Sequence, residues 1–137
     1  MLLADKKTPA QRILVVDDEP FVCESVKMML THDGHSVETA GGGREALTKY
    51  HPERFDLVIT DYKMEGMKGD ELARAIKQIA PAKPIILLTA FAPAEKPASI
   101  DLILTKPFYF DTLREAILQM QQWQVEQGQS TGSSQTP

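Results

Sequence analysis

The sequence is poor in cysteine: Cys23 is the only one in 137 residues. A single cysteine excludes an internal disulfide and a zinc site built from several cysteines. Because Cys23 falls within a helical pattern of apolar residues, we predict that it packs in the core and is not a reactive thiol.

Long apolar runs are also lacking. None approaches the ~18 residues that predict a membrane span. The apolar start Met1-Leu2-Leu3 meets the charged residues Asp5, Lys6 and Lys7 almost at once, which is not the pattern of a signal-peptide core. We therefore expect a cytoplasmic protein that makes no contact with a membrane.

Clusters of lysine and arginine are the third absence. The net charge is −4, so the chain has no overall basic field to attract nucleic acid or anionic lipid. We therefore expect no direct binding to nucleic acid. The composition, 42% hydrophobic and 25% charged, is typical of a soluble globular protein, and the length fits one domain.

Short apolar, β-branched runs alternate with stretches of helical spacing along the chain. This alternation predicts an α/β fold with a doubly wound parallel sheet. Helices are predicted to begin at Pro20, near Arg44 and near Leu72, and the last one follows Asp111 as its N-cap. The predicted strands cover residues 13–16, 36–39, 57–59, 85–88 and 102–104.

Both ends of the chain differ in composition from the middle. Residues 1–10 contain a polar stretch followed by Pro9 and predict a flexible leader, and residues 11–127 carry the strand and helix patterns of the domain. Residues 128–137 are rich in glycine, serine, threonine and glutamine, which predicts a disordered tail or linker.

Polar side chains follow the predicted strands where each strand ends. Asp17 and Asp18 follow the first strand, Asp61 follows the third, Thr89 follows the fourth and Lys106 follows the fifth. Because the carboxyl ends of parallel strands meet at one edge of a sheet, these side chains should converge.

The negative charges of such a cluster repel one another, and a bound cation would offset this repulsion. Two like charges ~5 Å apart at an effective dielectric of ~20 repel by roughly 3 kcal/mol, so three carboxylates beside one lysine favour a bound cation. Oxygen ligands without a soft donor select Mg²⁺ or a similar hard ion. A carboxylate, Mg²⁺, a lysine and a hydroxyl are together the groups needed to move a phosphoryl group onto Asp61.

With these motifs in place, the chain resembles the receiver domain of two-component response regulators, of which the single-domain chemotaxis regulators are the simplest form. The resemblance spans about residues 11–125 and implies a flavodoxin-like sheet of five strands in the order 2-1-3-4-5. The segments that carry it are Val15-Val16-Asp17-Asp18-Glu19-Pro20, Asp61 with Met64, Met67, Gly69 and Glu71-Leu72, Leu88-Thr89-Ala90, and Thr105-Lys106-Pro107-Phe108.

The resemblance also implies a function. Asp61 would accept a phosphoryl group from a histidine kinase or a phosphotransfer protein, and the chain would be no enzyme in the ordinary sense. Thr89 and Lys106 would contact the phosphoryl group, and the peptide bond before Pro107 would be cis. The Mg²⁺ ligands that the resemblance implies are Asp17, Asp18, Asp61 and the backbone carbonyl of Lys63.

Three departures from the family pattern concern how a signal leaves the domain. The stretch between Thr89 and Lys106 is too short for the usual loop, fourth helix and turn, and it contains Pro93 and Pro97. Since an interior proline breaks a helix, we predict that the fourth helix is shortened or missing. Ile103 stands where the family usually has an aromatic switch residue, and Glu65 stands where it usually has proline.

Two other functions fit parts of the pattern. One is a protein-binding module that works without phosphorylation through an altered output face. The other is a magnesium phosphatase of the dehalogenase type, but that class has a second aspartate where this chain has Lys63. The glutamine-rich segment 119–129 resembles linkers that join receivers to output domains. The signal would therefore pass either to a separate protein partner or to a fused output domain.

Overall fold

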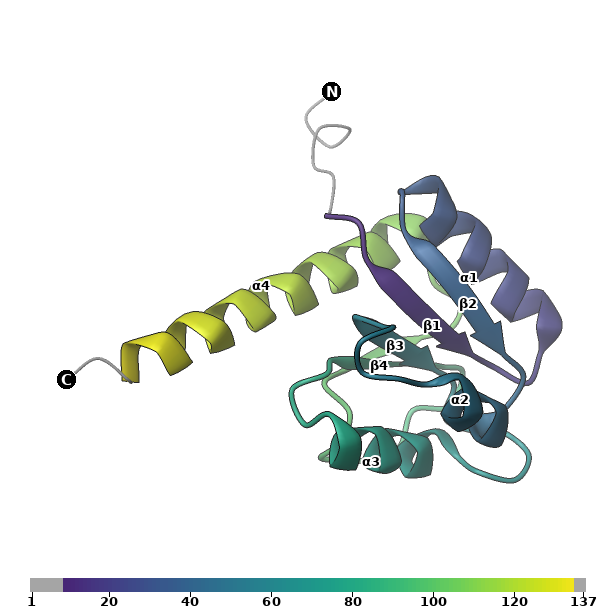
Figure 1. Cartoon of the computed structure of the whole chain (residues 1–137). Helices are drawn as coiled ribbons and strands as arrows, with labels where there is room; N and C mark the ends of the chain where they lie inside the picture. The colour runs from purple at the N-terminus through teal and green to yellow at the C-terminus, as the bar shows by residue number, and fades with distance from the viewer. Residues whose placement is uncertain (1–8, 135–137) are drawn as a thin grey trace.

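Continuous apolar runs form the central strands of a parallel sheet in the computed structural model, which describes residues 9–134 (Figure 1). The five strands lie in the order β2-β1-β3-β4-β5, and every neighbouring pair is parallel. This confirms the doubly wound sheet that the sequence predicts. The elements are β1 (Arg12–Val16), α1 (Pro20–His32), β2 (Ser36–Ala40), α2 (Gly43–Lys49), β3 (Leu57–Thr60), α3 (Gly69–Ile79), β4 (Ile85–Thr89), β5 (Leu102–Thr105) and α4 (Phe110–Ser134).

The core lies on both faces of this sheet. Strands β3 and β4 are buried along their whole length, as expected for strands covered by helices on both sides. On one face, residues of α2 and α3 pack against the sheet, and on the other face residues of α1 and α4 do so. Because both faces are covered, polar side chains can gather only at the ends of the strands.

The helix ends follow local sequence signals except at the two ends of α4. Pro20 begins α1, and Gly34 follows its end with φ +94°, a conformation that glycine adopts without strain. Asp111 was predicted as an N-cap, but Leu113 N donates to Tyr109 O (3.1 Å), so the helix begins at Phe110, two residues earlier than predicted. Asp111 instead lies in the first turn, where a carboxylate is favoured by the helix dipole.

Helix α4 is longer than predicted. Its backbone continues to Ser134 and projects beyond the sheet, although the sequence predicts a disordered tail or linker from residue 128 (Figure 1). Residues 135–137 of that tail and residues 1–8 of the predicted leader lie outside the described residues. Within residues 9–134, no helix has both the length and the apolar character needed to cross a bilayer.

The connection between β4 and β5 contains turns and bends but no helix over residues 90–101. This confirms the prediction from Pro93 and Pro97 that the fourth helix is shortened or missing. A fully buried Ile100 anchors the far end of the connection in the core. Two hydrogen bonds hold this turn, from Ile100 N to Pro97 O (3.0 Å) and from Lys96 Nζ to Ile100 O (2.7 Å).

Candidate functional site

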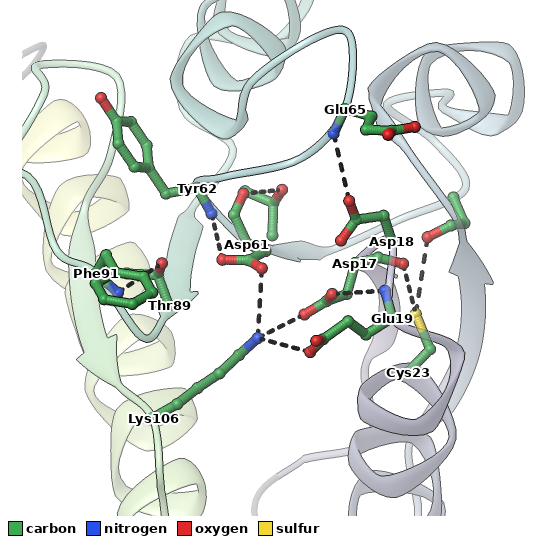
Figure 2. Close-up of polar contacts among 12 residues, drawn as sticks. Asp17, Asp18, Glu19, Cys23, Asp61, Tyr62, Glu65, Thr89, Phe91 and Lys106 are labelled. Atoms are coloured by element: carbon green, nitrogen blue, oxygen red, sulfur yellow. Dashed lines mark hydrogen bonds and ion pairs between the residues drawn. The ribbon is translucent and has the colours of Figure 1, made fainter.

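Three aspartates meet at the carboxyl edge of the sheet (Figure 2). Asp17 and Asp18 follow β1, and Asp61 follows β3, the neighbouring strand. Ligand oxygens of the three carboxylates all lie within 4.8 Å of one another. Asp17 and Asp61 are buried and Asp18 is exposed, so the cluster opens to solvent on the side of Asp18.

Lys106, which follows the edge strand β5, brings a positive charge to this cluster. Its Nζ lies 2.9 Å from Asp17 Oδ2 and 3.3 Å from Asp61 Oδ2, with Glu19 Oε1 at 4.0 Å. The backbone of the lysine is tied to β4, because Lys106 N donates to Thr89 O (2.8 Å). The peptide bond to Pro107 is cis, as the resemblance implies.

The charges at the site influence one another. Burial raises the pKa of Asp17, although hydrogen bonds from Lys106 and from the Glu19 amide oppose the shift. Burial acts against the charged form of Lys106 as well, but its contacts with Asp17 and Asp61 outweigh burial and raise the pKa of the lysine. Lys106 therefore stays positively charged, and a further cation would stabilise the buried Asp17 as a carboxylate.

Backbone amides of the following loops fix one oxygen of each carboxylate. These bonds run from Glu19 N to Asp17 Oδ1 (2.9 Å), from Tyr62 N to Asp61 Oδ1 (2.7 Å) and from Glu65 N to Asp18 Oδ2 (3.3 Å). The acids are thus held in position before any ligand arrives, which lowers the entropic cost of binding one. An all-oxygen, strongly negative donor set of this kind fits Mg²⁺.

Thr89 lies at the same edge, at the end of β4, and is fully buried. Its hydroxyl accepts a hydrogen bond from Phe91 N (3.3 Å), a residue of the loop that follows β4 (Figure 2). The structure therefore brings Lys106 into direct contact with Asp17 and Asp61, and it places Thr89 at the end of β4, the strand next to β3.

Gly69 is a part of the site whose role the sequence pattern did not reveal. It begins α3, and its amide donates to Tyr62 O (2.9 Å). A Cβ at this position would overlap the carbonyl oxygen of Asp61 and lie 3.0 Å from Tyr62 Cα. The loop after Asp61 can therefore close onto α3 only because residue 69 has no side chain. In the sequence, Gly69 is signalled only by its place among the residues that carry the family resemblance.

Cys23 lies near the site but does not belong to its chemistry. The thiol is buried and donates to the carbonyl oxygen of Asp17 (Sγ···O 3.4 Å). Burial raises the pKa of Cys23 to about 11. Since the thiolate is the reactive form, this cysteine is an inert core residue, as predicted.

The chain matches the family model described as "Response regulator receiver domain" over residues 13–118. Among curated proteins, it is 38% identical over 110 residues to the transcriptional regulatory protein GlrR of Escherichia coli, covering 77% of this chain and 25% of that protein. It is 34% identical over 113 residues to the probable transcriptional regulatory protein TcrX of Mycobacterium tuberculosis, covering 79% of this chain and 47% of that protein. The chain thus spans a quarter to a half of the length of these relatives.

Solved structures of response regulators have a similar fold. The response regulator TrrA of Thermotoga maritima, in complex with Mg²⁺-BeF, is 40% identical with a TM-score of 0.74, covering 80% of this chain and 98% of that chain. A CheY-like receiver domain protein of Methanospirillum hungatei is 30% identical with a TM-score of 0.80, covering 87% of this chain and 99% of that chain.

Proposed function

The chain belongs to the response regulator receiver domain family of two-component systems, and on this basis we propose that Asp61 accepts a phosphoryl group from a histidine kinase or a histidine phosphotransfer protein. The observation that carries the proposal is the buried Asp61 carboxylate, paired with Lys106 and flanked by two further acids. Burying an acid close to two other acids costs stability, and such clusters of charged groups are found preferentially at functional sites.

Each residue of the site has a separate role in the phosphoryl transfer. A carboxylate oxygen of Asp61 attacks the phosphorus of a phosphohistidine, the new P–O bond forms, and the P–N bond breaks as the imidazole leaves. Lys106 already lies 3.3 Å from Asp61 Oδ2, so its ammonium can stabilise negative charge on the transferred oxygens. Thr89 can donate its hydroxyl proton to one of those oxygens. Mg²⁺, held by Asp17, Asp18, Asp61 and the Lys63 carbonyl, would supply further neutralisation of charge.

The domain acts in this scheme as an acceptor and not as an enzyme with a separate substrate. Phosphorylation would alter the surface that meets a downstream protein or a fused output domain. Relatives of which this chain covers only a part are named transcriptional regulatory proteins, which makes a fused output domain the simpler arrangement.

Covalent labelling tests the acceptor directly. Incubation with acetyl phosphate and Mg²⁺, followed by borohydride trapping and peptide mass spectrometry, is expected to mark Asp61 alone. The variant Asp61→Asn should take up no label while keeping its fold, because asparagine has a similar shape. Label on Asp17 or Asp18 with Asp61 clean would refute the assignment. Absence of label throughout would favour the phosphorylation-independent binding module.

Thermal unfolding tests the metal site. Adding Mg²⁺ is expected to raise the melting temperature, since a ligand at ten times its Kd stabilises the folded state by about 1.4 kcal/mol. Asp18→Asn should remove most of this response, whereas Glu115→Gln, an exposed acid on α4, should leave it intact. A melting temperature that does not change across millimolar Mg²⁺ would contradict a metal site here.

A further inference from the structure

Two loops that leave the neighbouring strands β3 and β4 contact each other beside the acidic site. Lys63 lies two residues after Asp61, and its Nζ sits 5.0 Å from the centroid of the Phe91 ring. Phe91 lies two residues after Thr89, and its amide donates to Thr89 Oγ1 (3.3 Å). The contacts therefore run without a break from the loop of the phosphoryl acceptor to the hydroxyl of Thr89.

The hydrogen bond from Phe91 decides what the Thr89 hydroxyl can do. A hydroxyl has one hydrogen to donate and two lone pairs to accept with. Phe91 N–H occupies one lone pair, so the hydroxyl hydrogen stays available for another acceptor. Only 1% of Thr89 is exposed, and bulk water therefore does not compete for it. In this arrangement Thr89 is prepared to donate to an oxygen bound at Asp61.

Phe91 itself is weakly held. Phe91 is 65% exposed, and the connection over residues 90–101 has no helix to restrain it. The ammonium of Lys63 over the ring is thus an important restraint on where the Phe91 backbone lies. Attraction between a cation and an aromatic face holds the two groups together without fixing either in the core.

We propose that Lys63 is a positioning residue for Thr89 and acts through Phe91. The side chain of Lys63 holds the ring of Phe91, and the amide of Phe91 orients the hydroxyl that meets the phosphoryl group. This role rests on the proposed acceptor function of Asp61. It concerns the side chain of Lys63 and is separate from any role of the Lys63 carbonyl as a metal ligand.

Hydrogen exchange of the unliganded protein gives the first test. Lys63→Met keeps the length of the side chain and removes its charge, so the Phe91 amide is expected to exchange about two- to fivefold faster, the range of an exposed cation–aromatic contact. Lys63→Arg retains the cation and should keep the wild-type rate. Lys27→Met, which removes an exposed lysine of α1, is the matched control. An unchanged Phe91 rate in Lys63→Met would overturn the proposal.

Titration with beryllofluoride and Mg²⁺ gives the second test. Lys63→Met is expected to weaken binding about two- to fivefold in the wild-type background and to have no effect in a Thr89→Ala background, because the lysine acts through that hydroxyl. An equal loss in both backgrounds would mean that the lysine acts on the anion directly, which overturns the positioning role. A wild-type protein that binds no beryllofluoride would instead refute the acceptor function, even where the exchange effect on the Phe91 amide is found.

Discussion

Replacing Gly69 with alanine is expected to destabilise the domain by about 3 kcal/mol and to weaken cation binding at the same time. Contacts between carbon and oxygen are ordinarily about 3.3 Å or longer, and a Cβ at residue 69 would lie well inside this distance from the Asp61 carbonyl oxygen. Both obstacles are backbone atoms, of Asp61 and of Tyr62, so no side chain can rotate away. Either α3 or the Asp61 loop must move, and the carboxylate moves with it.

Urea unfolding without metal and Mg²⁺ titration measure the two effects. Gly42→Ala is the matched control, since a Cβ at residue 42 would meet nothing within 4 Å and its backbone is extended. That variant should stay within about 1 kcal/mol of the wild type, because Gly42 is the N-cap of α2 and alanine is a poorer N-cap than glycine. Equal stability of Gly69→Ala and Gly42→Ala would show that the close approach of α3 to Asp61 is unimportant. A loss of stability with unchanged Mg²⁺ affinity would show that the carboxylate does not follow the loop.

The parts of the site that could be predicted are those with local signals. Asp17, Asp61 and Lys106 each end an apolar run, and a parallel sheet brings such ends together whatever their separation in sequence. The missing fourth helix was predictable for the same reason, because the helix-breaking effect of Pro93 and Pro97 depends only on their own backbone.

Contacts between distant residues could not be predicted in this way. The pairing of Lys63 with Phe91 depends on how two loops bend after their strands, and neither loop has a regular pattern. Similarly, the composition after residue 128 is typical of a linker, yet the backbone of α4 continues to Ser134. A helix already begun can extend at little further cost, because nucleation is the costly step.

The structural role of Asp101 has no signal in the sequence. Replacing Asp101 with alanine is expected to lower the free energy of unfolding by about 2–3 kcal/mol. Its Oδ2 accepts from Lys77 Nζ (2.8 Å) and from Ile85 N (2.8 Å), and its amide donates to Ile85 O (2.9 Å). Asp101 thus joins the end of α3 to the first residue of β4 and closes the connection that lacks a helix. Without the carboxylate, the amide of the buried Ile85 loses its partner. The Lys77 ammonium, on a side chain that is 18% exposed, loses its counter-charge and keeps its hydrogen bond to Lys83 O (2.7 Å).

Urea unfolding and hydrogen exchange together measure this effect of Asp101→Ala. The Ile85 amide should lose its protection, while amides in the middle of β4 such as Leu87 follow only the global loss of stability. Adding Lys77→Met should recover part of the loss, since it removes an ammonium that no longer has a neighbouring carboxylate. Glu38→Ala breaks the exposed pair with Arg54 and should change stability by no more than about 1 kcal/mol. If Asp101→Ala costs no more than Glu38→Ala, the turn around Ile100 alone is sufficient to hold the connection in place.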